Sequence, residues 1–256
     1  MKLAEMKAIV TGGASGLGEA TVRRIVARGG KAAIFDLNAE RAERLIEELG
    51  EEAVYFLKTD VADAEQVEQH VAQTVNHFGG VNAVVNCAGI GTPGKVVSKN
   101  GAMPLEQFEK VIRINLIGSF NVLRVAALAM QQNEPNEDGE RGLIISTASV
   151  AAYEGQIGQA AYSASKGGIV SMTLPIAREF ARDGIRVMAI APGLMKTPMF
   201  DGLPESAIES LSASVPFPAR LGKPDEYAQL VESIAENTML NGEVIRLDGA
   251  IRMQPK

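Results

Sequence analysis

A tyrosine and a lysine stand four residues apart in the stretch AYSASKGG, residues 161 to 168. On a helix this spacing places Tyr162 and Lys166 on one face. A free phenol titrates at about 10, so it needs about 4 kcal/mol of electrostatic help to act as an acid–base near neutral pH. An ammonium about 4 Å away supplies roughly that amount at an effective dielectric near 20. The pair is therefore a candidate general acid–base, although solvated helix faces often carry the same two residues.

A glycine-rich turn, TGGASGLG from Thr11 to Gly18, follows the first apolar run and precedes an amphipathic stretch. Glycines there permit a tight turn and let the backbone approach a pyrophosphate at the N-terminus of the next helix. The spacing is TGxxxGxG rather than GxGxxG, and a plain structural turn is the alternative. The strand before it and the helix after it favour a dinucleotide site. Its predicted residues are Gly12, Ser15, Gly16, Leu17 and Gly18.

An acidic residue, Asp36, ends the second predicted strand, 18 residues after Gly18. It can accept hydrogen bonds from the adenosine ribose and would repel a 2′-phosphate, which favours NAD over NADP. No Arg or Lys stands at positions 14, 15, 17 or 37 to bind that phosphate. An ordinary turn residue is the alternative for Asp36. Later strand ends supply further candidates for the cofactor site, namely Asp60 and Val61 at the adenine and Asn86, Ala88 and Gly89 along the cofactor.

Seven short apolar runs alternate with amphipathic stretches along the chain. They are continuously apolar, as expected for strands that are buried on both faces. The runs are KAIVT, KAAIF, AVYFL, NAVVN, GLIIST, IRVMAIA and GEVIRL. This order predicts a single α/β domain over residues 1–256, a Rossmann-type doubly wound parallel sheet of about seven strands. Ligands of such sheets bind beyond the carboxyl ends of the strands, so we expect the insertion 91–102 and the proline-rich segment 193–222 to flank the site.

The composition argues against several classes of protein. With 256 residues, 46% of them hydrophobic, the chain can bury one full-sized core. A net charge of −6 argues against nonspecific nucleic-acid binding. Cys87 is the only cysteine, and no Cys/His spacing suggests a metal site. We find no apolar run of membrane-span length and no room for a targeting peptide before the first strand, so we expect a soluble cytoplasmic protein without membrane, metal or nucleic-acid partners.

Taken in order, these residues resemble the short-chain dehydrogenase/reductase family over essentially the full length. The matching positions are Thr11–Gly18, Asp36, Asp60, Asn86–Gly89, Asn115, Ser149, Tyr162, Lys166 and Pro192–Gly193. The resemblance implies that Tyr162 exchanges a proton with the substrate oxygen and that Ser149, thirteen residues upstream, polarises it. It implies that Tyr162 and Lys166 both contact the cofactor, with Lys166 binding the nicotinamide ribose, and that Lys166 lowers the pKa of Tyr162. It further implies that Asn115 holds a water linked to Lys166, and that Pro192, Gly193 and Thr197 complete the cofactor site.

Longer stretches resemble one subgroup of that family, the type-2 3-hydroxyacyl-CoA dehydrogenases, also known as 17β-hydroxysteroid dehydrogenase type 10. They are ASVAAYEGQIGQAAYSASKGGIVSMTLPIARE, IRVMAIAPGL and NGEVIRLDGAIRMQP. The implied reaction is reversible, NAD-dependent oxidation of an L-3-hydroxyacyl-CoA to the 3-ketoacyl-CoA, with an acyl-CoA as partner and a homotetramer as the usual assembly. Gln156 matches a subgroup position near the substrate. Leu194 and Met199 can line the acyl pocket, although ordinary loop packing explains them equally well.

Two other kinds of function stay open at this point. The same machinery serves dehydrogenases of steroids or other secondary alcohols and 3-oxoacyl carrier-protein reductases; Asp36 counts against the last, which more often use NADP. A non-catalytic NAD-binding scaffold belongs to a different class. Its natural signature is the loss of Ser149, Tyr162 or Lys166, and all three are present.

Overall fold

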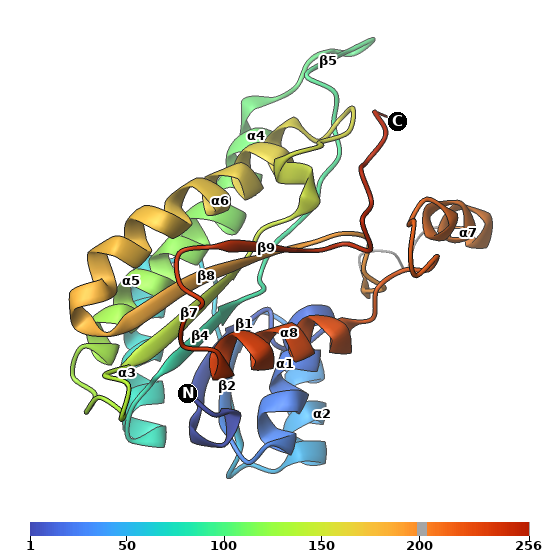
Figure 1. The fold of residues 1–256 in the computed structure, drawn as a ribbon. Coiled ribbons are helices and arrows are strands. Elements are labelled where there is room, and N and C mark those ends of the chain that lie inside the picture. The colour runs from blue at the N-terminus through green and yellow to red at the C-terminus, as the bar shows by residue number, and fades with distance from the viewer. Residues whose placement is uncertain (199–203, 256) are drawn as a thin grey trace.

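The computed structural model describes residues 1–198 and 204–255 and contains the predicted sheet. Seven parallel strands lie in the order β3-β2-β1-β4-β7-β8-β9 (Figure 1). Their bounds are Lys7–Thr11 for β1, Lys31–Asp36 for β2, Val54–Lys58 for β3, Ala83–Asn86 for β4, Gly142–Thr147 for β7, Ile185–Pro192 for β8 and Val244–Leu247 for β9. The prediction of a doubly wound parallel α/β sheet is confirmed, and each of the seven apolar runs forms a strand.

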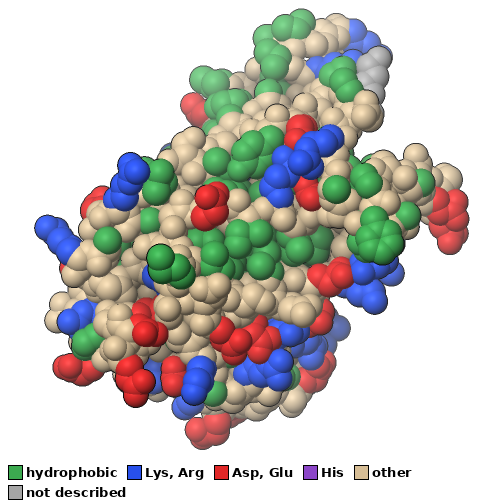
Figure 2. All heavy atoms as spheres, viewed as in Figure 1, with side chains coloured by type: hydrophobic (Ala, Val, Ile, Leu, Met, Phe, Trp, Pro, Cys, Tyr) green, Lys and Arg blue, Asp and Glu red, His purple; other side chains and the backbone are tan. Residues whose placement is uncertain are grey.

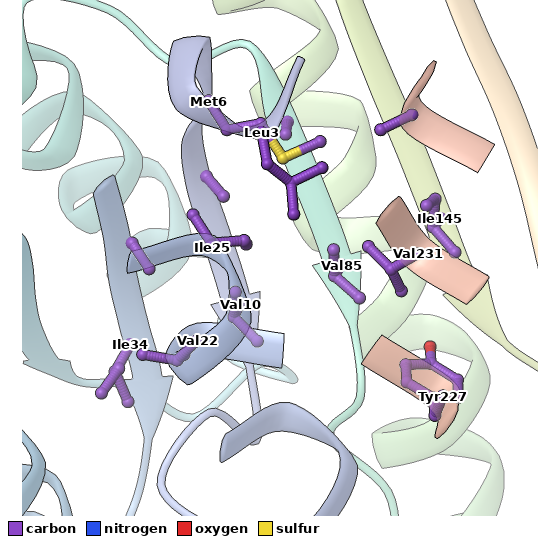
Figure 3. Close-up of a cluster of buried hydrophobic side chains, with 14 of the residues drawn as sticks. Leu3, Met6, Val10, Val22, Ile25, Ile34, Val85, Ile145, Tyr227 and Val231 are labelled. Carbon is purple, nitrogen blue, oxygen red and sulfur yellow. The ribbon is translucent and has the colours of Figure 1, made fainter. Parts of the chain in front are cut away.

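Helices cover both faces of the sheet (Figure 1). Helices α1 (Gly16–Ala27), α2 (Ala39–Leu49) and α8 (Pro224–Glu236) pack on one face. Helices α3 (Ala64–Phe78), α5 (Gly118–Met130) and α6 (Ala160–Phe180) pack on the other, and α4 (Leu105–Ile112) lies against α6. Because neighbouring residues of a strand point to opposite faces, Val10 of β1 joins the first core cluster while Ile9 joins the second. Figure 3 shows the first cluster, with Val10 and Val85 from strands facing side chains of α1 and α8.

The strand order reverses between β1 and β4. The chain moves outward from β1 to β2 and β3, and then returns to place β4 on the other side of β1. At such a switch point the loops after the two central strands diverge and leave a crevice at the carboxyl edge. The glycine-rich turn after β1 and the Asn86–Gly89 turn after β4 both open onto this crevice.

Two smaller elements project beyond the sheet. A hairpin of β5 (Val97–Ser98) and β6 (Gly101–Ala102) forms in the predicted insertion after β4. Helix α7 (Glu205–Ala213) stands apart from the sheet in the proline-rich segment before α8 (Figure 1).

One expectation about membranes requires correction. Within the described residues, the helical stretch Leu105–Met130 is long and apolar enough by composition to cross a membrane. Half of its most apolar window is buried inside the protein. Its C-terminal part, α5, packs against α3, β4 and β7. In this structure the stretch is therefore part of the helical layer that covers the sheet.

Candidate active site

A cavity of about 600 Å³ lies at the carboxyl ends of strands β1 to β4. Most residues predicted to bind the dinucleotide line it: Gly12, Ser15, Gly16, Leu17, Gly18, Asp36, Asp60, Val61, Ala88, Gly89 and Thr197. The motifs did not assign its other lining residues to the cofactor: Phe35, Leu37, Thr59, Cys87, Ile90, Gly91, Ile114 and Pro198. Most of these stand within a few residues of a strand end, and that position is the signal that would have identified them.

The turn between β1 and α1 depends on glycine at three places. Gly12 and Gly16 have φ angles of 62° and 54°, in the left-handed region that other residues rarely adopt. A Cβ on Gly18 would collide with the carbonyl oxygen of Gly12. The backbone at the N-terminus of α1 therefore faces the cavity with no side chain in between, as a bound pyrophosphate requires. This geometry supports the dinucleotide site over the plain structural turn.

The carboxylate of Asp36 is held at the edge of the cavity by two backbone amides. Ala14 N donates to its Oδ2 at 3.1 Å, and Asn38 N donates to its Oδ1 at 2.9 Å. A carboxylate oxygen accepts more than one hydrogen bond, so both oxygens keep lone pairs for ribose hydroxyls. The two amides hold this negative charge at the edge of the cavity, where it would repel the 2′-phosphate of NADP.

Five residues predicted for the cofactor do not line the cavity: Asn86, Pro192, Gly193 and the two candidates of α6, Tyr162 and Lys166. Asn86 is buried, and its side-chain Nδ2 donates to Ser119 O of α5 and Ser146 Oγ of β7. Pro192 pairs with Leu247 at the end of β9, and Gly193 lies directly against Asp248. Asn86 therefore joins β4 to its neighbours, and Pro192 and Gly193 close the end of β8 against β9.

The predicted proton-transfer residues come together beside this cavity from two elements. Ser149 follows β7, and its Oγ accepts a hydrogen bond from Ala151 N at 3.1 Å in the short turn Val150–Ala152. Tyr162 lies in the first turns of α6. Burial raises the pKa of the Tyr162 phenol, while a hydrogen bond with Ser149 lowers it. The structure thus brings Ser149 and Tyr162 into contact, as the predicted proton transfer to a substrate oxygen requires.

Lys166 lies one turn after Tyr162 on α6, and its ammonium lies beside the Tyr162 ring. Its Nζ lies 5.7 Å from the centroid of the Tyr162 ring and donates to the carbonyl oxygen of Thr147 at 2.7 Å. Burial lowers the pKa of Lys166 to about 8. Burial is the largest influence on the Tyr162 phenol in this arrangement, and the lowering of its pKa by Lys166 stays a prediction.

Asn115 is held in a π-helical turn, Arg113–Ile117, between α4 and α5. Its side-chain amide exchanges two hydrogen bonds with the backbone of Ile90, at 2.8 and 2.9 Å, and donates to Ser165 Oγ at 3.1 Å. Ser165 Oγ in turn donates to the carbonyl oxygen of Tyr162 at 2.7 Å. Asn115 therefore ties the cofactor loop after β4 to the helix of Tyr162. A π-turn leaves no simple mark in a sequence, and Ser165 was not predicted to take part.

The residues predicted to contact substrate are more scattered. The side-chain Nε2 of Gln156 donates to Gln254 O of the C-terminal segment at 3.0 Å. Leu194 lines a separate cavity of about 100 Å³ together with Val215 and Leu247. Met199 lies outside the described residues.

An ion-pair cluster that the motifs did not reveal fixes the connection between Ser149 and Tyr162. Arg246 of β9 donates to both carboxylate oxygens of Glu154, at 2.8 and 2.9 Å, and also to Asp248 at 2.7 Å. The Arg246 guanidinium lowers the pKa of Glu154. Paired, two-oxygen contacts of this kind fix orientation as well as distance. The loop between the two catalytic candidates is therefore attached to the last strand of the sheet.

Comparison with known proteins agrees with this geometry. The family model described as short chain dehydrogenase matches residues 6–207. The chain belongs to the short-chain dehydrogenase family. It is 55% identical over 250 residues to human 3-hydroxyacyl-CoA dehydrogenase type-2, covering 97% of this chain and 95% of that one. The Drosophila melanogaster protein of the same name is 51% identical over 249 residues, covering 96% and 97% of the two chains.

A solved structure supports membership of the short-chain dehydrogenase family in three dimensions. The crystal structure of 3-hydroxyacyl-CoA dehydrogenase type-2 from Mycobacterium avium superposes with a TM-score of 0.93 at 44% identity, covering 97% of this chain and 96% of that chain.

The cofactor of the present chain is NAD. The residues present fit it, since the glycine turn leaves the backbone open to a pyrophosphate and Asp36 lines the cavity with oxygens that can accept from ribose hydroxyls.

Replacement of Asp36 tests the basis of cofactor selection. Asp36→Ala should lower the ratio of kcat/KM with NAD to that with NADP by about tenfold or more, because the ribose acceptor and the repulsion of the 2′-phosphate are both lost. Steady-state kinetics with the two cofactors measure the ratio. Glu43→Ala makes the same charge change on the exposed face of α2 and serves as the control. An Asp36→Ala ratio equal to that of wild type would remove Asp36 from this role.

Proposed function

We propose that this chain is an NAD-dependent 3-hydroxyacyl-CoA dehydrogenase, which oxidises an L-3-hydroxyacyl-CoA to the 3-ketoacyl-CoA and runs in reverse with NADH. One observation supports the substrate most strongly. Five curated relatives, each 51% to 55% identical over at least 96% of this chain, are all named 3-hydroxyacyl-CoA dehydrogenase type-2. Relatives with other substrates, such as ipsdienol dehydrogenase of Ips pini, are only 34% identical.

The reaction removes a hydride from C3 of the substrate and a proton from its hydroxyl group. NAD accepts the hydride when it is bound in the cavity after β1 to β4. The Tyr162 phenol, beside Ser149, is the group placed to take the proton in its ionised form and to return it in the reverse direction. Ser149 Oγ donates a hydrogen bond to the same substrate oxygen and stabilises the negative charge that develops there.

Lys166 is placed to stabilise the ionised form of the Tyr162 phenol. Its buried ammonium is held by Thr147 O on one side and lies over the Tyr162 ring on the other. A positive charge at this position favours the phenolate. The positively charged nicotinamide ring of bound NAD would act in the same direction. Burial raises the pKa of Tyr162, and these two positive charges act against that rise.

A spectrophotometric assay tests the proposed substrate. Acetoacetyl-CoA should oxidise NADH in the presence of the purified chain, followed by the loss of NADH absorbance. Longer 3-ketoacyl-CoA compounds, a ketosteroid and simple ketones form the comparison panel. Activity on the steroid or simple ketones, without activity on any acyl-CoA, would replace the acyl-CoA function with a dehydrogenase of other secondary alcohols.

We also propose that the chain assembles as a homotetramer, on the basis of two apolar surfaces. Strand β9 lies at the edge of the sheet, and Figure 2 shows hydrophobic side chains gathered over it, between α6 and α8. A second surface lies along α5 and the turn before it, where Ile117, Phe120 and Leu128 are each about half exposed or more, at 48%, 47% and 65%. Two different faces of this kind are what a tetramer with two types of contact needs.

Light scattering should give the mass of four chains, and the mass of one chain would contradict this assembly.

A further inference from the structure

Lys166 depends on one backbone oxygen for its position. Among the described residues, Thr147 O is the only protein acceptor within hydrogen-bond distance of the Lys166 ammonium, at 2.7 Å. Lys166 as a whole is 5% exposed, so water does not freely replace that contact. A buried cation without an acceptor is costly, and its pKa falls accordingly. Whatever fixes the Thr147 carbonyl therefore also fixes Lys166.

Thr147 is the last residue of β7, and its side chain is held from the opposite face of the sheet. Its Oγ1 donates to Asn86 O at 2.6 Å. Because a hydroxyl has a single proton, the 2.8 Å hydrogen bond between Thr147 Oγ1 and Tyr227 Oη must be donated by Tyr227. Tyr227 thus anchors the Thr147 hydroxyl from α8, while Lys166 reaches the Thr147 carbonyl from α6.

Tyr227 is unusual for a core residue. It is completely buried within the first core cluster, where a phenylalanine would fill the same space without a polar group (Figure 3). Its hydroxyl is directed to Thr147, and the Cys87 thiol lies at 3.8 Å. Burying a hydroxyl is favourable only when its hydrogen bonds are made, and here Tyr227 donates to Thr147, the residue that holds Lys166.

We propose that Tyr227 is a positioning residue for Lys166, which acts through the Thr147 hydroxyl to fix the carbonyl oxygen that binds the ammonium. The chain of contacts runs from Tyr227 on α8 to Thr147 on β7 and then to Lys166 on α6. It therefore connects the two helical layers of the sheet at the site. This inference rests on the proposed role of Lys166 in proton transfer.

Three titratable groups besides Lys166 border this chain of contacts. Tyr162 faces Lys166 from its own helix, Cys87 from the turn after β4, and Tyr227 from α8 through Thr147. Burial raises the pKa of Tyr162, Cys87 and Tyr227 and lowers that of Lys166 to about 8. Without Tyr227 the Thr147 hydroxyl loses its donor, and its bond to Asn86 O and the pairing of β7 with β8 are left to hold the end of the strand. The ammonium is then less well bound, and its pKa should fall further below the ordinary lysine value.

The experiment measures Lys166 directly and needs no substrate. A pH titration by NMR of the full chain with ¹³Cε-labelled lysine gives the pKa of Lys166, whose signal is identified by its loss in Lys166→Met. Tyr227→Phe and Thr147→Val should each lower this pKa by roughly half a unit or more. The double variant should show about the same shift as either single variant, since both break one chain of contacts. Thr147→Ser, which keeps the hydroxyl, should retain most of the wild-type pKa.

The same change should appear in the kinetics of oxidation, in the alkaline limb of the pH profile, where kcat falls as the pH rises. In Tyr227→Phe this limb should move to lower pH by a similar amount, because Lys166 loses its positive charge at a lower pH. Tyr55→Phe, a tyrosine on β3 stacked against His77, is the matched control. A lower melting temperature of Tyr227→Phe, with the Lys166 pKa and the alkaline limb unchanged, would show that Tyr227 only supports the core and would overturn the inference. The NMR result is independent of the acyl-CoA assay, so failure of the proposed substrate and failure of this inference give different results.

Discussion

A lysine ammonium buried at the end of a parallel sheet is the constraint on which this site depends. A cation in such a position must be given an oxygen by the protein, and the carboxyl end of β7 provides it through Thr147. That oxygen is in place because β7 lies between β4 and β8, with Ser146 beside Asn86 and Thr147 beside Ile190. The parallel register of the sheet therefore determines where Lys166 can lie.

The other parts of the site are attached to the same edge of the sheet. Asn115 fixes the loop after β4 to α6, and Arg246 fixes the loop after β7 to β9 through Glu154. Each attachment joins elements that are distant in the sequence but end at the same edge. Tyr162, Ser149 and the cofactor cavity are consequently held by a rigid sheet rather than by their own loops, which suits a reaction that requires close alignment of hydride and proton transfer.

The sequence predicts some parts of this structure better than others, for physical reasons. All seven strands could be predicted because each is a continuous apolar run, including the partly buried edge strands β3 and β9. Gly12 and Gly18 mark a turn in which no side chain would fit. The contact between Lys166 and Thr147 was missed because it depends on a backbone carbonyl, which every residue has. The π-turn of Asn115 and the pairing of Glu154 with Arg246 depend on tertiary packing, which local pattern does not encode. Asn86 matched a family motif, yet its side chain joins β4 to α5 and β7.

Single-turnover kinetics of Tyr162→Phe test the central claim most directly. The enzyme with bound NAD is mixed rapidly with L-3-hydroxybutyryl-CoA, and NADH formation is followed by absorbance. Tyr153→Phe, in the connection before α6, is the control. Loss of the proton acceptor should slow hydride transfer by about 10²- to 10⁴-fold, while NADH binding, measured by its fluorescence, stays close to wild type. NADH formation at the wild-type rate in Tyr162→Phe, with cofactor binding intact, would contradict the account.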